Sequence, residues 1–191
     1  MTLALSRPPL PNFPGQSVAG WTWQDYQDMT DDGHRYELLE GDLAMSPSPT
    51  RDHQFVTGCL YRRLVDRIGD RGAVLIAPFD VHLDGDTVVQ PDVVVALAGG
   101  RSQLLNSHLD GIPDLVVEVL SDRNRDAVRK RRIYAAVGVP EYWLADPQAR
   151  TLTVWRHDGH GYPDAPALAG DAPVISGIAL GEPMPARWWL G

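Results

Sequence analysis

Three features that often reveal a compartment, a cofactor or a reaction are missing from this sequence. Its 191 residues include one cysteine, Cys59, so an internal disulfide is excluded and we expect a reducing cytoplasm as its location. No apolar run is long enough to cross a bilayer, and residues 1–16 lack a charged leader followed by an apolar core, so we expect neither a membrane span nor export. A glycine-rich phosphate-binding loop and a GxSxG nucleophile turn are also missing, which argues against P-loop and α/β-hydrolase chemistry.

Lysine is almost missing too. Lys130 is the only lysine among 17 Lys and Arg residues, so arginine carries nearly all of the positive charge. An ammonium is compact and mobile whereas a guanidinium is planar, so we expect a lysine to be kept where arginine cannot replace it. On a helical wheel over residues 121–137, Lys130 lies in the middle of the stripe that should face a sheet. The residues within roughly 60° of it are Asp126, Ala127, Ile133, Tyr134 and Val137.

A charge in the middle of this stripe needs a partner, because buried ions are tolerated only when they are paired or bound to a metal. The alternative is a lysine whose stem covers apolar surface while its ammonium reaches solvent. The scarcity of lysine and the position of Lys130 on the wheel favour the buried arrangement.

The chain as a whole is acidic. With 25 Asp and Glu against 17 Lys and Arg, its formal net charge is −8, so it has no overall attraction for nucleic acid. This counts against a nuclease without excluding one. One basic cluster could contact a phosphate backbone locally, or it could be a solvated helix face. The cluster comprises Arg123, Arg125, Arg129, Lys130, Arg131 and Arg132.

The length and the 43% content of hydrophobic residues predict one domain with a sizeable core, over residues 17–191, after an irregular proline-rich arm, 1–16. The order of its elements predicts an α/β (α+β) fold with a mixed β-sheet flanked by helices. Three helices are expected. The first spans 23–29 and is capped by Thr22, and the second spans 52–68 and ends at Gly69. The third spans 121–137, with Ser121 as its cap and Gly138 at its end. The expected strands are two within 35–45, then 73–83, 88–97, 114–120, 141–146 and 151–157.

Two of these strands, 73–83 and 88–97, should form a hairpin about the turn at residues 84–86. Residues 98–113 are expected to form a longer connection. The tail beyond His157, with repeated glycine and proline, is only weakly informative.

Glu118 lies in the middle of a strand, PDLVVEVLS, that is apolar on both faces, so its carboxylate needs compensation. Asp114 shares its face but is ~13 Å away at about 3.3 Å per residue, too far to hold the same metal ion. Asp92 begins its strand while Glu118 is near the end of its own, so antiparallel pairing would bring these two carboxylates together, in a pair that suits Mg²⁺. Taken alone, Asp92 could be a strand-entry residue and Glu118 half of a structural ion pair.

The arrangement of Asp92 after Pro91, with Glu118 on the next strand, resembles the PD-(D/E)XK nuclease superfamily. A closer resemblance, over residues 21–155, is to the Uma-type putative restriction endonuclease family. It is carried, in order, by YELLEGDL, SPTRDHQ, PDVVV, PDLVVEVLS, the lysine-to-tyrosine helix and GVPEYWLADP. The resemblance implies a restriction-endonuclease-like fold, hydrolysis of DNA with Mg²⁺ or Mn²⁺ as cofactor, and a homodimer.

The sequence departs from the superfamily pattern at Leu120, which stands two residues after Glu118 where the pattern has lysine. The resemblance therefore implies that Lys130 supplies the ammonium from the following helix, orienting the attacking water and stabilising charge on the phosphoryl oxygens. It also implies a metal held by Asp92, Glu118 and the backbone carbonyl of Val119, with Glu37 completing the outer ligand set. A further match to the family pattern, to which we assign no physical role, is His53.

Two other functions remain open at this point: a catalytically inactive module on the same fold that binds nucleic acid or protein, and a hydrolase of some other phosphodiester. His157 and His160 could suggest zinc, but without a nearby cysteine pair and in a glycine-rich context we expect a surface turn. We expect core and rim packing, rather than stacking on bases, for Trp21, Trp23, Trp143 and Trp155.

Overall fold

The computed structural model of the protein describes residues 8–13, 16–121 and 126–191. Part of the expected N-terminal arm lies outside these residues, and residues 8–13 and 16 belong to no helix or strand. The division into an arm and a single domain stays a prediction. The helices are α1 (Trp23–Gln27), α2 (Arg51–Ile68), α3 (Ala127–Val137) and α4 (Ala186–Leu190), and a 3-10 turn spans Gly69–Arg71. None of the helices in the described residues is long and apolar enough to cross a membrane.

The first seven strands are β1 (Ser17–Ala19), β2 (Tyr36–Leu39), β3 (Asp42–Met45), β4 (Gly72–Ile76), β5 (Asp80–Asp84), β6 (Thr87–Val89) and β7 (Val93–Leu97). The others are β8 (Arg101–Leu104), β9 (His108–Ile112), β10 (Leu115–Val119), β11 (Glu141–Asp146), β12 (Thr151–Arg156), β13 (Ala167–Ala169), β14 (Pro173–Val174) and β15 (Met184–Pro185).

Most of these strands belong to two large sheets. One has the order β1-β3-β2-β6-β5-β9-β8, and the other has the order β13-β12-β11-β10-β7-β4, while β14 and β15 pair separately. Each large sheet combines antiparallel pairs with one parallel pair, β5 with β9 and β10 with β11. The mixed α+β fold is therefore confirmed, with the strands divided between sheets instead of forming one.

The division arises in the predicted hairpin. Its turn lies where expected, but each long arm breaks: 73–83 becomes β4 and β5, and 88–97 becomes β6 and β7. Pro78 and Pro91 lie in the two breaks, and proline interrupts a strand because it has no N–H to donate to the ladder. The base of the hairpin, β4 with β7, therefore lies in the six-stranded sheet, and its tip, β5 with β6, lies in the seven-stranded sheet. The expected connection 98–113 is a second hairpin, β8 and β9, so that expectation is wrong.

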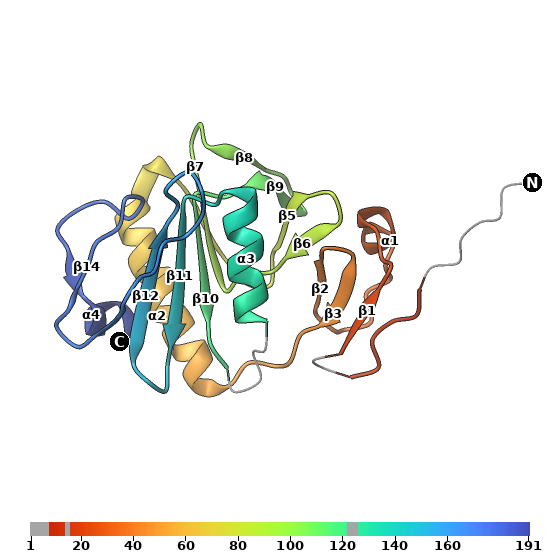
Figure 1. Ribbon diagram of the computed structural model, residues 1–191, viewed down its shortest axis with the longest axis horizontal. Coiled ribbons are helices and arrows are strands. Elements are labelled where there is room, and N and C mark those ends of the chain that lie inside the picture. Colours follow the sequence, from red (N-terminus) through yellow and green to blue (C-terminus); the bar gives the residue numbers. More distant parts are fainter. Residues whose placement is uncertain (1–7, 14–15, 122–125) are drawn as a thin grey trace, which may run out of the picture.

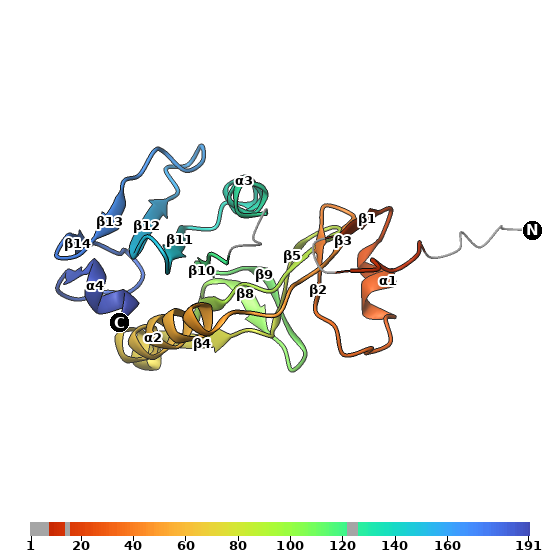
Figure 2. The same ribbon diagram turned by 90° about the horizontal axis from the view of Figure 1, so that it is seen from below.

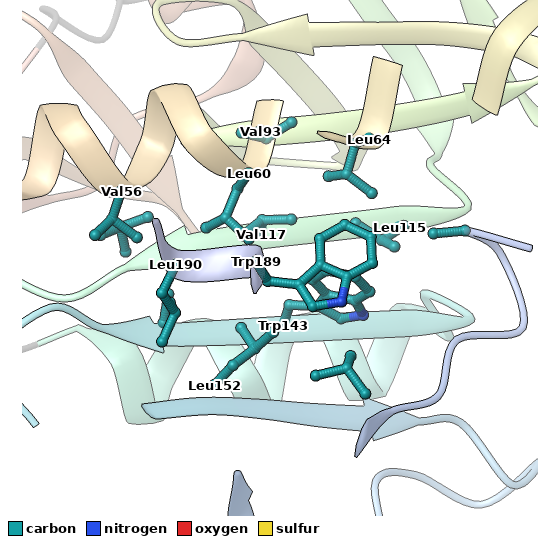
Figure 3. Packing of buried hydrophobic residues seen from close by; sticks show 14 of the residues in the cluster. Val56, Leu60, Leu64, Val93, Leu115, Val117, Trp143, Leu152, Trp189 and Leu190 are labelled. Carbon is teal, nitrogen blue, oxygen red and sulfur yellow. The ribbon is translucent and has the colours of Figure 1, made fainter. Parts of the chain in front are cut away.

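Helices α2 and α3 cover opposite faces of the six-stranded sheet (Figures 1 and 2). On the α2 face, Leu60 and Leu64 pack against Val93, Val117 and Trp143 (Figure 3). Helix α4 completes this cluster through Trp189. Burial of each such leucine contributes about 1.5–3 kcal/mol, so this layer anchors the sheet. The tail, weakly informative as sequence, thus completes the core.

The α3 face is built from the alternate strand positions. Val94 of β7, Val116 of β10 and Tyr142 of β11 pack there with Ile133 and Tyr134 of the helix. Because side chains alternate along a strand, Glu118 points to the same face as Val116. The carboxylate of Glu118 and the covering helix α3 therefore meet.

Helix boundaries agree with the sequence at α2 and differ at α3. Thr50 caps α2 by accepting a hydrogen bond from the backbone N–H of His53, and Gly69 ends that helix. The described α3 begins at Ala127 with Asp126 as its N-cap, so the expected cap at Ser121 is wrong, and residues 122–125 of the expected first turn lie outside the described residues. Gly138 ends α3 with a φ of 77°, a left-handed conformation that glycine adopts without strain.

Candidate active site

Strands β7 and β10 pair antiparallel, with Val93 opposite Val117, which is the condition under which the sequence brings Asp92 and Glu118 together. One step beyond this pair come Asp92 and Glu118, at the same end of the sheet. The backbone N–H of Val119 donates to Oδ2 of Asp92 at 2.7 Å, which fixes this carboxylate against the end of β10. Asp92 and Glu118 are 7% and 3% exposed, so both carboxylates are held out of bulk water.

Lys130 reaches the same place from α3. Its Nζ lies 2.8 Å from Oε1 of Glu37 and 3.0 Å from Oε1 of Glu118. The lysine is 5% exposed, so it is buried and ion-paired, as its place in the sequence suggested. Glu37, on β2, also accepts a 2.7 Å hydrogen bond from the backbone N–H of Gln90. One ammonium therefore joins carboxylates from the two different sheets.

Burial and charge set the protonation of this group. Burial raises the pKa of Glu118 to about 7; the Lys130 charge opposes the rise, and the charges of Asp92 and Glu37 add to it. Burial by itself would lower the pKa of Lys130, but Glu118 and Glu37 outweigh it and hold that pKa above its usual value. The ammonium therefore stays charged at neutral pH while the Glu118 carboxyl titrates there.

Tyr134 is a site residue that the sequence placed only in the apolar stripe. Its hydroxyl donates to Oε1 of Glu118 at 2.7 Å, from one helical turn beyond Lys130. Burial, followed by the charges of Glu118 and Glu37, raises the pKa of Tyr134, so its hydroxyl keeps its proton and remains a donor. The signal in the sequence was the i, i+4 spacing of this tyrosine from the lysine.

His53 now acquires a physical role. Its Nε2 lies 3.1 Å from Oδ2 of Asp92, and its Nδ1 lies 3.5 Å from the hydroxyl of Thr57. Oδ2 thus receives both the histidine and the Val119 N–H, whereas Oδ1 has no hydrogen-bond partner among the residues that the structure describes. The first turn of α2 carries the histidine to the end of β7, a contact that periodicity alone does not predict.

Glu37, His53, Asp92, Glu118 and Lys130 line a pocket. Its cavity volume is about 80 Å³, several times the space that one water molecule needs. The lining comprises Arg35, Glu37, Ala44, Met45, Ser46, Pro47, Ser48, Pro49, His53, Gln90, Asp92, Glu118, Val119, Ser121, Asp126 and Lys130. The predicted site residues Asp92, Glu118, Lys130, Glu37 and Val119 are all in this set.

The donor set fits a hard divalent cation. Oδ1 of Asp92 and Oε2 of Glu118 have no hydrogen-bond partner within the described ranges, so each carboxylate keeps one oxygen available. Among the described residues, no three His, Cys, Asp or Glu side chains come together in a group that could hold a metal ion. Mg²⁺ commonly binds one or two carboxylates and keeps several waters, so a pair of carboxylates suffices for it.

The basic cluster of the sequence is largely neutralised within the fold. Arg129 lies 2.9 Å from a carboxylate oxygen of Asp42, and Arg132 pairs with Glu40. Arg131 stacks over the ring of Trp155 at 4.5 Å. Arg123 and Arg125 lie outside the described residues. The described part of the cluster therefore matches a helix face paired with its own neighbours.

The tryptophans follow their sequence interpretation, whereas His157 differs from its own: it is half-buried, with Nε2 3.0 Å from the backbone carbonyl oxygen of Ala135. Trp21, Trp143 and Trp155 are buried, and Trp23 stacks on His82 with ring centroids 4.4 Å apart. These tryptophans pack within the protein. His160 is exposed in the turn where it was expected.

Comparison with known proteins adds a family and a fold. A family model, Uma2, described as "putative restriction endonuclease", matches residues 23–181. The crystal structure of a protein described as a putative nuclease belonging to DUF820, from Anabaena variabilis, superposes with a TM-score of 0.72. At 18% sequence identity, the match covers 89% of this chain and 99% of that chain, so it shows a shared fold. No curated protein matches the sequence.

Proposed function

Because the chain belongs to the Uma2 family of putative restriction endonucleases, whose fold and nuclease character it shares, we propose that it is a metal-dependent endonuclease that hydrolyses DNA phosphodiester bonds. One observation carries the proposal beyond the family: Lys130 lies between Glu37 and Glu118, beside Asp92, in one pocket. Two carboxylates with available oxygens next to a buried ammonium are the groups that phosphodiester hydrolysis requires.

In this proposal Asp92, Glu118 and the backbone carbonyl of Val119 would hold Mg²⁺ or Mn²⁺. When bound, the metal would supply Lewis acidity, polarising the phosphate and lowering the pKa of a water molecule. Glu37 would belong to the outer ligand set, and its contacts tie it to Lys130 and to the backbone of Gln90. Hydrolysis adds the oxygen of water to phosphorus, breaks one phosphorus–oxygen bond and delivers the water proton to the products.

Lys130 has a specific task in this reaction. Two carboxylates occupy part of its hydrogen-bonding capacity, and an ammonium has three N–H donors. The remaining donor orients the attacking water and stabilises the negative charge that develops on the phosphoryl oxygens. Tyr134 and His53 act as positioning residues, since each contacts one oxygen of a carboxylate, Oε1 of Glu118 or Oδ2 of Asp92, and leaves the other oxygen available.

A second candidate function is a catalytically inactive module that binds nucleic acid or protein through this fold. The pairing of Arg129 and Arg132 with acidic neighbours favours the protein-binding form of this module, because these arginines already contact carboxylates of the same chain. The acidic net charge of −8 points the same way.

Plasmid nicking tests the proposal. Supercoiled plasmid is incubated with the protein and Mn²⁺ or Mg²⁺, with Lys130→Ala as the inactive variant and Arg132→Ala as a matched change on the same helix. We expect nicking by the wild type and by Arg132→Ala, and none by Lys130→Ala. Absence of nicking by the wild type under every metal supports the module, and cleavage of RNA in place of plasmid would change the substrate.

Metal titration separates the two functions independently of cleavage. An active site should bind Mn²⁺ in a manner that is lost in Asp92→Ala and in Glu118→Ala, whereas a module should be indifferent to both changes. We also propose a homodimer, because cutting both strands favours two-fold pairs, and light scattering of the purified protein tests it.

A further inference from the structure

Arg35 directly precedes β2 and lines the same pocket as Glu37 and Lys130. Side chains two positions apart on a strand share a face, so Arg35 and Glu37 point to the same side, roughly 6.6 Å apart along the chain. The backbone carbonyl of Arg35 accepts a 2.8 Å hydrogen bond from the N–H of Ser46, which continues the β2–β3 pairing past the end of β2. The arginine is therefore positioned by the sheet and not by a loop.

The pocket has a surplus of negative charge. Its described lining carries the carboxylates of Glu37, Asp92, Glu118 and Asp126 against the cations of Arg35 and Lys130. Lys130 is committed to two of the carboxylates. A divalent cation held by Asp92 and Glu118 would do no more than balance these carboxylates, so an anionic phosphodiester would bind better where a cation outside the metal site also contacts it.

Arg35 differs from Arg129 and Arg132 of α3 in having no ion-pair partner among the residues that the structure describes. Its Nε donates to the side-chain oxygen of Gln90 at 3.2 Å, a neutral acceptor. Gln90 is itself fixed, because its amide donates to Asp80 at 2.7 Å. The guanidinium is thus oriented by a neutral amide while its charge and its two Nη groups remain available.

We propose that Arg35 binds the phosphate group next to the one that is cut, so that the strand is aligned across the pocket before hydrolysis. This inference rests on the proposed function, whose metal and lysine would engage the scissile phosphate. The hydrogen bond of Arg35 to Gln90, whose backbone N–H donates to Glu37, holds the guanidinium on the Glu37 side of the pocket, where the neighbouring phosphate would lie. A guanidinium suits this task because its planar fork donates two parallel hydrogen bonds to phosphate oxygens.

The test measures DNA binding apart from cleavage. A fluorescein-labelled DNA duplex is titrated with wild type, Arg35→Gln, Arg35→Lys and Arg62→Gln in Ca²⁺ over a series of salt concentrations. Arg62→Gln is the matched control, because Arg62 is an exposed arginine on α2 outside this pocket. We expect Arg35→Gln to bind the duplex at least about tenfold more weakly than the wild type. The salt slope, meaning the slope of log affinity against log salt concentration, should become shallower by about 0.9, as expected for the loss of one phosphate contact. Arg35→Lys should keep most of the slope and lose part of the affinity.

Cleavage kinetics and metal binding complete the test. In Mn²⁺, Arg35→Gln should raise KM for plasmid at least about tenfold with kcat little changed, and its Mn²⁺ affinity should equal that of the wild type. Loss of Mn²⁺ binding in both Arg35 variants would show a structural role and overturn the inference. So would wild-type DNA affinity and salt slope in Arg35→Gln.

The outcomes also separate this inference from the proposed function. If the wild type binds DNA but cuts nothing, while Arg35→Gln binds DNA more weakly and with the smaller salt slope, the nuclease proposal fails and Arg35 stands as a phosphate contact. If the wild type cleaves while Arg35→Gln behaves like it, only the Arg35 contact is overturned. A wild type that binds no DNA in any metal overturns both.

Discussion

Nζ of Lys130, on α3, lies 3.0 Å from Oε1 of Glu118, on β10, across twelve positions of sequence. In the PD-(D/E)XK pattern the lysine would stand two residues after the glutamate, where this chain has Leu120. Helix α3 covers the face to which Glu118 points, so the ammonium of Lys130 contacts this carboxylate from the helix. In the superfamily pattern the lysine would contact it from the same strand. The contact is the structural basis for the catalytic role that we propose for the lysine.

Replacing Lys130 with arginine should reduce the nicking rate at least about 100-fold, the size of effect seen when a donor to a developing oxyanion is lost. The larger, planar guanidinium does not fit between Glu37 and Glu118 at a position that is 5% exposed. Initial rates on supercoiled plasmid measure the loss, and circular dichroism checks that the fold is kept. Arg132→Lys, an exposed change on the same helix, serves as control. A Lys130→Arg rate near wild type would remove the lysine from the mechanism.

Mn²⁺ affinity should depend on pH through Glu118. Burial raises the pKa of this carboxyl to about 7, and a protonated carboxyl does not bind a cation, so affinity should rise up to about tenfold per pH unit below 7 and level off above it. Calorimetric titrations between pH 5.5 and 8 provide the profile. An affinity that is flat across this window would contradict the prediction.

The raised pKa of Glu118 also makes the stability of the metal-free protein depend on pH. The direction is opposite to that of the Mn²⁺ affinity, because this stability falls as the pH rises. The folded pKa of Glu118 lies above its ordinary value of 4.5, so the folded state binds the proton more tightly than the unfolded state does. This contribution to the free energy of unfolding is fully present below about pH 4.5 and is lost as the pH rises through about 7. Urea denaturation of wild type and Glu118→Gln across this window measures it, since the glutamine variant lacks the titration.

Removing the imidazole in His53→Ala should weaken Mn²⁺ binding by roughly 10- to 100-fold, the usual effect of losing a hydrogen bond to a metal ligand. The reason is that Asp92 would keep only the Val119 N–H on Oδ2 and could rotate away from the metal. Calorimetry measures the affinity, with the exposed His160→Ala as control. Equal affinities for the two variants would show that the histidine does not position Asp92.

Leu60→Ala should lower the free energy of unfolding by about 2–5 kcal/mol, because Leu60 is fully buried between α2 and the sheet (Figure 3). For a chain of this size that corresponds to a fall in Tm of roughly 4 to 20 °C. Below its transition the variant should still bind Mn²⁺ like the wild type, since the leucine does not line the pocket. A fall in Tm of under about 2 °C would mean that the core tolerates the cavity.

Periodicity was a good guide wherever one face of an element is buried. The buried residues of α3 are Lys130, Ile133 and Tyr134, the centre of the predicted stripe. The alternation of the strands also placed Glu118 and Asp92 at one end of the sheet, because an antiparallel pair joins a start to an end. These parts of the candidate site depend only on local pattern.

The remainder depends on tertiary arrangement, which local pattern does not contain. Pro78 and Pro91 were visible as interruptions, but only the packing of both sheets shows that the hairpin passes from one to the other. The contact of His53 with Asp92 requires α2 to lie across the end of β7, and the docking of Arg35 requires Gln90 to be held by Asp80. Residues far apart in the chain meet in each case.

The passage of the hairpin between sheets has a mechanical consequence. Asp92 and Glu118 stand at the end of one hydrogen-bonded ladder, β7 with β10, whereas Glu37 belongs to the other sheet. A displacement of one sheet against the other would lengthen the contact between Glu37 and Lys130 and leave the spacing of Asp92 and Glu118 unchanged. Such a displacement would therefore change the contacts of Lys130 but not the spacing of the two carboxylates proposed to hold the metal.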